Sequence, residues 1–545
     1  MNSFPAKYHR LETVPVPVGE VMVGGGHPVV LQSMTNTSTM DTAATVAQSM
    51  RLVDAGASLV RITAPSVKAA ENLQEIKTAL RRKGYRVPLI ADIHYQAKAA
   101  EVAARIVEKV RINPGNYTDR SVPGKKTFSD ADYQAELERI HSRLKPLVQV
   151  CNTYGTALRV GSNHGSLSQR IMSRYGNSPE GMAVAAMEFI EILEDLGFHK
   201  IVVSMKASNP RVMVYSVRRM VAMMQAHGRV YPFHLGVTEA GNGREGRIKS
   251  AVGISSLLEE GIGDTIRVSL TEAPEKELPV AALIAGHYGE MTSAKEPLSV
   301  SLPVGHTAYR GRMNKHEHPV WAIPSEVPPP AISWITVTTP SLSEDLLRAV
   351  AGDERLGVIL DLSRATALCP YRTLFAQLAR LEREVFVMLK ADFGSLPKEE
   401  LYVKAARLFG FFLLDGLGDG VMASSRVISD EALYPVLLDL LQASRVRISK
   451  AEFIACPSCG RTQFNIEKAL EEVKKATSSL KGLTIGVMGC IVNGPGEMAD
   501  ADYGYVGAGR GKVALYKGQQ QVANNVPEEE AVQRLLELIE RDTPS

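Results

Sequence analysis

The first 290 residues alternate short β-branched runs with amphipathic segments of helical length, and this alternation restricts the fold more than any other feature. Eight runs have the length and composition of buried strands: 29–34, 58–63, 88–94, 109–113, 157–163, 200–208, 233–241 and 264–270. Eight successive βα units predict a (β/α)₈ barrel (TIM barrel), with helices such as 43–56 and 179–197 outside a closed parallel sheet. The alternative is a doubly wound open sheet. However, the glycine run 24–26 precedes a strand and lacks G-x-G-x-x-G spacing, so it predicts a turn.

A change of pattern after residue 290 predicts two further domains. Residues 305–332 are polar and then rich in proline, which is typical of a linker. Four apolar runs follow, which we interpret as the strands of an α/β insert over 291–428: 334–339, 356–363, 383–392 and 407–416. We expect the insert to be a structural spacer, with Cys369 as a small buried residue and three solvated loop histidines, His306, His316 and His318.

The last domain, 429–545, begins with a predicted connecting helix at 429–444. A strand leading into "CPSC", a helix at 465–480 and a strand at 483–489 follow, which predicts a small α+β domain after the 1–290 barrel and the 291–428 insert.

The bulk composition is that of an ordinary globular chain, with 45% of the 545 residues hydrophobic and 22% charged. A formal net charge of +3 gives no sign of a nucleic-acid partner. The first residues lack a signal-peptide or transit pattern, and no apolar run approaches the length of about eighteen residues that spans a bilayer. We therefore expect a soluble, cytoplasmic protein. Its five cysteines are too few for a disulfide scaffold and favour metal or redox chemistry.

Polar residues stand at the C-terminal ends of the predicted barrel strands, where the active face of such a barrel lies. They are Arg61, Asp92, Arg111, Asn113, Arg159, Asn163, Lys206, Glu239, Arg267 and Ser269. Five converging cations would repel one another unless an anion with several oxygens neutralised them, so the pattern predicts a polyanion site, most simply for a diphosphate. The alternative is a set of rim ion pairs, with Asp92 and Glu239 as partners. Flexible glycines after Glu239 in "VTEAGNG" instead predict an acid placed for proton transfer.

Three cysteines follow predicted strands in the last domain: Cys456 and Cys459 in "CPSC", and Cys490 in "MGCIVNGPGE". The first motif alone fits a zinc knuckle, a redox dithiol or part of an iron–sulfur site. Zinc would require a second pair or a histidine, and a dithiol would not require Cys490. Three thiolates plus the carboxylate of Glu497 fit an iron–sulfur cluster with one distinctive iron. The alternative for Glu497 is a helix-end or surface acid.

These motifs resemble a known family. "IACPSCGRT" and "GVMGCIVNGPGE", together with "QSMTNT", "VRINPGN", "LRVGSNHGS", "SMKASN" and "HLGVTEAG", are similar to the hydroxymethylbutenyl diphosphate synthases, iron–sulfur enzymes of the non-mevalonate isoprenoid pathway. The resemblance covers about 1–290 and 429–545. The insert makes the chain similar to the longer, three-domain members, whose middle domain is regarded as structural.

The resemblance implies an oxidoreductase that opens the ring of 2-C-methyl-D-erythritol 2,4-cyclodiphosphate with two electrons and loss of water. The product would be 4-hydroxy-3-methylbut-2-enyl diphosphate, an isoprenoid precursor. A [4Fe-4S] cluster would be held by Cys456, Cys459, Cys490 and Glu497, Glu239 would supply a proton, and Asn493 would lie near the cluster. The substrate pocket would comprise Arg61, Asp92, Arg111, Asn113, Arg159, Asn163, Lys206, Thr238, Arg267 and Ser269.

The resemblance also implies partners. Electrons would come from a ferredoxin or a flavodoxin, and the protein would be a homodimer in which the cluster of one subunit caps the barrel of the other. Closure within one chain fits the sequence equally well. Two other functions remain open: a barrel enzyme for another phosphorylated or pterin-like substrate with a structural metal in the tail, and a non-catalytic electron carrier.

Overall fold

The computed structural model describes residues 9–93, 95–117, 127–288, 292–294, 321–324, 332–459, 462, 464–477, 480–491, 496 and 498–542. Contacts divide the chain into two compact units. One comprises Met1–Leu11, Arg247–Ile262 and Glu290–Ser449, and the other comprises Glu12–Gly246, Gly263–Gly289 and Lys450–Ser545. None of the described helices is both long and apolar enough to cross a membrane.

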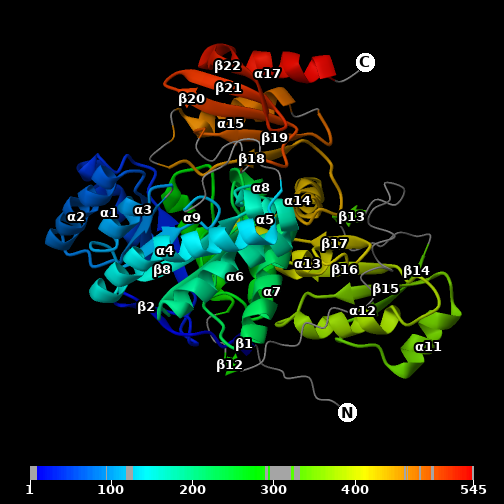
Figure 1. The fold of residues 1–545 in the computed structure, drawn as a ribbon. Coiled ribbons are helices and arrows are strands. Elements are labelled where there is room, and N and C mark those ends of the chain that lie inside the picture. The colour runs from blue at the N-terminus through cyan, green and yellow to red at the C-terminus, as the bar shows by residue number, and fades with distance from the viewer. Residues whose placement is uncertain are drawn as a thin grey trace. The chain divides into compact units, whose positions relative to one another are not determined.

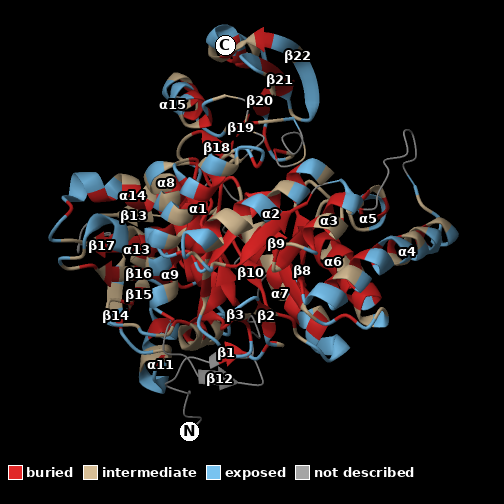
Figure 2. Cartoon of the chain, turned by 90° about the vertical axis from the view of Figure 1, so that its left-hand side faces the viewer, coloured by how far each residue is buried: buried red, intermediate tan, exposed pale blue. Residues whose placement is uncertain are grey.

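Eight parallel strands form the barrel, as predicted: β4 (Val30–Met34), β5 (Leu59–Thr63), β6 (Leu89–Asp92), β7 (Lys109–Ile112), β8 (Ala157–Asn163), β9 (Ile201–Lys206), β10 (His234–Leu235) and β11 (Thr265–Ile266). They pair in chain order, β11 pairs with β4, and a parallel bridge from Val203 to Phe233 joins β9 to the start of β10. The eight strands therefore form a closed barrel. Figure 2 shows these strands buried within a layer of helices whose outward faces are exposed.

Six of the nine helices described around the barrel begin at a residue whose side chain caps the first turn. The nine helices are α1 (Thr42–Asp54), α2 (Val67–Arg82), α3 (Ala97–Ala103), α4 (Asp130–Tyr154), α5 (Gln169–Tyr175), α6 (Pro179–Asp195), α7 (Pro210–His227), α8 (Gly243–Glu259) and α9 (Glu277–Gly286). Ser178 and Asn209 accept hydrogen bonds from the first turns of α6 and α7, and proline follows each cap. Proline suits that position because its missing N–H would have no helical partner there. Gly197 has a positive φ just past α6, a backbone conformation that favours glycine at the end of a helix.

A short hairpin closes one end of the barrel. Its strands, β2 (Val16–Val18) and β3 (Val21–Val23), are antiparallel. Their valines form one buried cluster with residues from the first halves of the barrel strands: Val30, Leu59, Ile90, Ala157 and Val202. The hairpin therefore plugs the N-terminal end of the barrel, which leaves the C-terminal ends of the strands as the open face. The glycine run 24–26 forms the predicted turn between β3 and β4.

The cysteine-bearing domain is a mixed sheet with helices on one face (Figure 1). Strands β18 (Glu452–Ala455), β19 (Thr484–Met488) and β20 (Tyr503–Gly509) are parallel, and β21 (Lys512–Lys517) and β22 (Gln520–Pro527) continue antiparallel. Helices α15 (Ile466–Thr477) and α17 (Glu528–Asp542) bury Leu470 and Leu535 against this sheet. Because β18 and β19 are parallel neighbours, their C-terminal ends and the cysteines that follow lie at the same edge of the sheet.

The insert contains a five-stranded sheet in which every pair is parallel. Its strands are β13 (Trp321–Ile323), β14 (Ser333–Val337), β15 (Leu356–Asp361), β16 (Val387–Asp392) and β17 (Gly420–Ser424), and helices α11 (Glu344–Gly352), α12 (Arg372–Leu378), α13 (Lys398–Leu413) and α14 (Asp430–Ala443) accompany them. Strand β1 (His9–Leu11) pairs with β12 (Thr292–Ala294) in the same unit. The three loop histidines lie outside the described residues. Cys369 is half-buried rather than buried, and its thiol donates to the carbonyl of Glu259.

The strand predicted at 407–416 is wrong, because residues 407–413 form the last part of helix α13 and a turn follows them. The run "RLFGFFLL" is buried on all sides, so its apolar positions show neither a helical nor a strand period. The domain limits 1–290, 291–428 and 429–545 stay a proposal. The contact-based units place α14 with the insert sheet.

Buried ion pairs join the insert to the C-terminal end of α8 within their unit. Arg372 donates to Glu260 at 2.7 Å and to Asp415, and Arg407 donates to Glu259 at 2.6 Å. All five side chains are less than a tenth exposed. These buried carboxylates need cationic partners, because burying an unpaired carboxylate greatly lowers the stability of the folded protein.

Arg372→Met is therefore expected to destabilise this unit by roughly 3–5 kcal/mol, because it leaves Glu260 and Asp415 without their cation. The urea midpoint of the full chain measures this loss. Arg348→Met is the matched control, since Arg348 pairs with Asp345 on the surface and is 75% exposed. Equal midpoints for the two variants would contradict a stabilising role for the buried pairs.

Candidate active site

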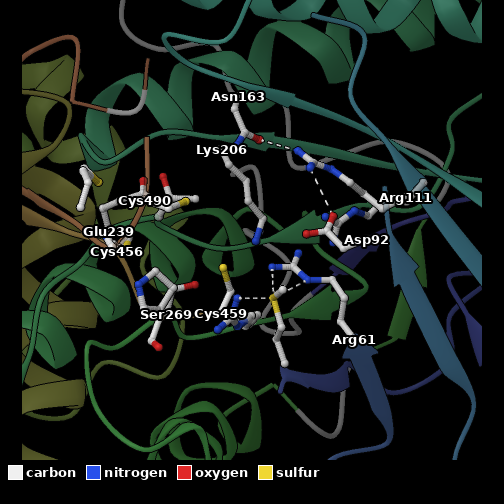
Figure 3. Close-up of a pocket in the computed structure, with 18 residues that line it drawn as sticks. Arg61, Asp92, Arg111, Asn163, Lys206, Glu239, Ser269, Cys456, Cys459 and Cys490 are labelled. Atoms are coloured by element: carbon white, nitrogen blue, oxygen red, sulfur yellow. Dashed lines mark hydrogen bonds and ion pairs between the residues drawn. The ribbon is translucent and has the colours of Figure 1, made fainter. Parts of the chain in front are cut away.

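A pocket with about 700 Å³ of empty space, part of it open solvent, lies over the C-terminal ends of the barrel strands. Its lining joins barrel residues and the cysteine-bearing loops: Met34, Arg61, Asp92, Arg111, Arg159, Asn163, Lys206, Thr238, Glu239, Arg267, Ser269, Cys456, Pro457, Ser458, Cys459, Met488, Gly489 and Cys490. Figure 3 shows the labelled cations and cysteines facing this common space. One chain therefore supplies both halves of the pocket.

Backbone contacts fix the cysteine segment over the barrel. Ala240 and Ala455 form a parallel bridge, and the N–H of Ala455 donates to the carbonyl of Glu239 at 3.3 Å. The hydroxyl of Thr271 lies 3.1 Å from the carbonyl oxygens of both Ala455 and Cys456. Because the chain continues directly from Ala455 to Cys456, these contacts set Glu239 and the first cysteine side by side.

Two of the five pocket cations are fixed by carboxylates. Arg111 pairs with Asp92 at 3.3 Å and donates to the amide oxygen of Asn163 at 3.1 Å (Figure 3). Arg267 forms a two-pronged contact with Glu277, at 2.9 and 3.1 Å. Such forked pairs hold a guanidinium group in one orientation. These two arginines therefore form ion pairs at the rim of the barrel, which was the alternative to a polyanion site.

The other three cations, Arg61, Arg159 and Lys206, have no carboxylate partner among the described residues. Two nitrogens of Arg61 point to the sulfur of Met34, a weak acceptor, at 2.8 and 3.0 Å. Nε and Nη1 of Arg159 are buried without a hydrogen-bond partner in the described part of the chain.

Burial and mutual repulsion act against the charges of these three side chains. Burial, partly offset by Asp92, lowers the pKa of Arg61 to about 10. Burial and then neighbouring arginines lower the pKa of Arg159 and of Lys206 well below their usual values. The directions of these shifts indicate that burial and the neighbouring cations act against the charged forms, and a bound anion would offset this effect.

The three cysteines around the pocket are free thiols. The Cys456 sulfur accepts the N–H of Gly489 at 3.2 Å, an approach that requires glycine, because a Cβ there would lie 2.8 Å from Thr462. Burial and then Cys459 raise the pKa of Cys456, and the N–H groups of Gly489 and Ser458 act against this rise.

This donor set fits a sulfur-bound metal group. Thiols grouped in one pocket become stable as thiolates when a metal binds them, and N–H groups aimed at sulfur support that charge. In the described stretches, no group of three or more His, Cys, Asp or Glu side chains forms a site for a single metal ion. In a cluster each protein ligand binds a different iron, so the ligands can stand further apart than around one ion.

One predicted site residue that the structure describes is not part of this lining. Asn113 is buried, and its side chain accepts the N–H of Gly115 at 3.0 Å, so it shapes the turn after β7. Asn493 and Glu497 lie outside the described residues, so their roles stay predictions. The other predicted residues line the pocket, and their functions also stay predictions.

Sequence reasoning missed Met34, Glu277 and Lys109. Met34 ends β4 beside Arg61, and Glu277 begins α9. Lys109 is fully buried in the barrel, its Nζ has no partner among the described residues, and burial lowers its pKa. In a single sequence, neither a methionine at the end of a strand nor a lysine at the start of one indicates a role near a site.

Arg159→Ala is expected to weaken binding of a diphosphate substrate by roughly 1.5–3 kcal/mol, about ten- to a hundredfold, with little loss of stability. Arg111→Ala should weaken binding similarly and also lower the melting temperature, because it leaves Asp92 buried without its cation. Calorimetric titration and thermal unfolding separate the two effects. Unchanged affinity with a lower melting temperature in Arg159→Ala would make Arg159 a barrel-core residue only.

Comparison with known proteins places this arrangement in a family. The model described as "GcpE TIM-barrel domain" matches residues 13–282, and "GcpE protein C-terminal domain" matches residues 452–541. Relatives from Parabacteroides distasonis and Bacteroides thetaiotaomicron are 42% and 43% identical, each over 98% of this chain and 98% of the relative. One from Akkermansia muciniphila is 43% identical over 98% of this chain and 97% of its own length. All three are named 4-hydroxy-3-methylbut-2-en-1-yl diphosphate synthase (flavodoxin). The chain belongs to the GcpE protein family.

Proposed function

We propose that this protein is a 4-hydroxy-3-methylbut-2-en-1-yl diphosphate synthase, the activity named for its relatives. It opens 2-C-methyl-D-erythritol 2,4-cyclodiphosphate reductively and releases water. The observation that carries the proposal is a single pocket that contains five cations, one acid next to a cysteine, and three free thiols. The cations suit the binding of a diphosphate, and the acid suits a reduction that consumes protons. The three thiols suit a metal cluster that delivers electrons.

The protein is an iron–sulfur enzyme on this proposal. Cys456, Cys459, Cys490 and Glu497 would hold a [4Fe-4S] cluster, which supplies single-electron transfer and a Lewis-acidic iron. The assignments of Glu497 as a ligand and of Asn493 as a neighbour of the cluster rest only on the family motif in the sequence.

The chain's own residues bind and orient the substrate. Arg61, Arg159 and Lys206 take the diphosphate oxygens, because they lack carboxylate partners among the described residues. Arg111 and Arg267 contribute charge from orientations that Asp92 and Glu277 fix. Thr238, Asn163 and Ser269 offer polar groups on the same lining, and Glu239 delivers a proton to the departing oxygen.

Flavodoxin is the electron donor that the relatives' names indicate, and a ferredoxin is the alternative. A cytoplasmic location and a homodimer remain part of the proposal. The family's capping between subunits is not needed to build this pocket, since both halves of its lining come from one chain. Sedimentation analysis of the reconstituted protein tests the dimer.

Anaerobic reconstitution followed by assay with the cyclic diphosphate and a chemical reductant tests the activity. We expect product formation together with about four iron and four sulfide ions per chain. Zinc without sulfide would favour a barrel enzyme with a structural metal in the tail. A full cluster without turnover of the cyclic diphosphate would favour an electron carrier.

A further inference from the structure

A carboxylate in the first turn of α8, that of Glu245, contacts two lysines of the cysteine-bearing domain. One of its oxygens accepts from the ammonium group of Lys450, and the other accepts from Lys474 at 2.8 Å. Lys450 lies two positions before β18, the strand that leads to Cys456, and Lys474 lies in α15. All four residues belong to the same compact unit. One acid on a barrel helix therefore joins two separate elements of the cysteine-bearing domain.

The surroundings of Glu245 favour its charged form and fix its partners. Burial alone would raise the pKa of Glu245, but Lys474 and then Lys450 outweigh it and lower this pKa to about 2. Lys474 also donates to the amide oxygen of Asn242 at 2.8 Å, and its ammonium group lies 5.5 Å from the ring centre of Phe453 in β18. Because the side chain of Glu245 is 34% exposed, each ion pair contributes little energy. The pairs therefore matter for the placement of the domain more than for stability.

The chain between β10 and α8 connects these ion pairs to the pocket. Glu239 lies at its start, and Glu245 follows six positions later. Between them, the carbonyl of Gly241 accepts the N–H of Thr271 at 2.9 Å, and the hydroxyl of Thr271 lies 3.1 Å from the carbonyl of Cys456. The same short segment therefore meets the cysteine-bearing domain through its backbone at one end and through charge at the other.

We propose that Glu245 is a positioning residue for the reaction, which through Lys450 and Lys474 holds the cysteine-bearing domain on the barrel so that Cys456 stays beside Glu239. Glu245 is not part of the pocket lining, so it acts through these groups. A rotation of the domain about the backbone contacts near Cys456 would move the lysines away from their shared anion. The inference rests on the proposed function, because the placement matters only if Glu239 and a group on the cysteines act on one substrate.

The test compares Glu245→Gln with Asp542→Asn in the full, reconstituted chain. Asp542 also pairs with a lysine, Lys517, at 2.9 Å, but both residues lie within the cysteine-bearing domain. Glutamine keeps the size of the side chain and leaves both lysines of the barrel contact without an anion. We expect hydrogen exchange in a peptide covering 451–456 to rise about fivefold in Glu245→Gln and to stay at the wild-type rate in Asp542→Asn. A wild-type rate in Glu245→Gln would overturn the proposal.

Kinetics distinguish positioning from a purely structural role. Turnover of Glu245→Gln at saturating cyclic diphosphate should fall about tenfold, because the reacting groups are no longer held in register. Iron content, melting temperature and the calorimetric affinity for inorganic diphosphate should stay close to wild type, since the barrel cations are unchanged. Glu245→Asp retains the charge and should recover part of the rate. Faster exchange with wild-type turnover in Glu245→Gln would overturn the positioning role.

Lys450→Met keeps the proposal testable if Glu245→Gln fails to fold, because it removes one of the same ion pairs from the other side. Exchange in 451–456 should rise about twofold, since Lys474 still contacts Glu245, and turnover should fall. Wild-type exchange and turnover in Lys450→Met would contradict the proposal. The exchange measurement does not require turnover. Failure of wild-type turnover would therefore reject the proposed function, whereas unaltered exchange in the Glu245 variant would reject the positioning role alone.

Discussion

Replacing Glu239 by glutamine is expected to lower turnover by roughly two to four powers of ten, because the pocket loses its positioned acid. Glu239 is 4% exposed and lines the pocket beside the cysteine loop. Its carbonyl accepts the N–H of Ala455, and its φ of +49° places it in a backbone conformation that few non-glycine residues adopt. Glutamine preserves the shape and these backbone contacts but cannot donate the proton.

Iron content, substrate affinity and the melting temperature of Glu239→Gln should stay close to wild type, which separates a chemical defect from misfolding. Glu239→Asp retains a carboxyl group on a shorter side chain and is expected to recover part of the lost rate. Near-wild-type turnover in the glutamine variant would remove Glu239 from the mechanism. A matching loss in the aspartate variant would point to shape rather than acidity.

The barrel could be predicted because each of its strands is buried on both faces. Runs such as 58–63 and 157–163 are mostly apolar or β-branched, and the strands that they form, β5 and β8, are buried at every position. The pocket followed from the same pattern, since parallel strands bring their C-terminal ends to one face. The helix at α13 shows where this reasoning fails, because a fully buried helix has the same continuous apolar composition as a buried strand.

Which pocket cations are paired could not be predicted. Arg267 meets Glu277 on the following helix, while Arg61 meets Met34 from the preceding strand, and no spacing rule distinguishes the two environments. The ion pairs of Glu245 with Lys450 and Lys474 join residues more than 200 positions apart. Contacts of this kind depend on the packing of domains, which the local patterns of one sequence do not encode.

Glu497→Cys and Glu497→Ala are expected to differ in a way that only a cluster ligand would produce. A carboxylate is a harder and weaker ligand than a thiolate for iron in such a cluster. Cysteine at this position should therefore hold iron at least as firmly as the native residue, while turnover falls by at least about a hundredfold because the fourth position no longer exchanges. Alanine should leave three protein ligands, Cys456, Cys459 and Cys490, and the cluster should lose iron on exposure to air.

Iron and sulfide content, the paramagnetic resonance signal of the reduced protein with and without the cyclic diphosphate, and turnover measure these effects together. The cysteine variant should keep its iron and lose the change in signal that the substrate causes. The alanine variant should lose both iron and turnover. Glu528→Ala is the matched control, because this acid lies in the same domain at the start of α17, away from the pocket lining. If both Glu497 variants match that control in iron, signal and rate, then Glu497 is a surface acid, and another group must complete the ligand set of the three cysteines.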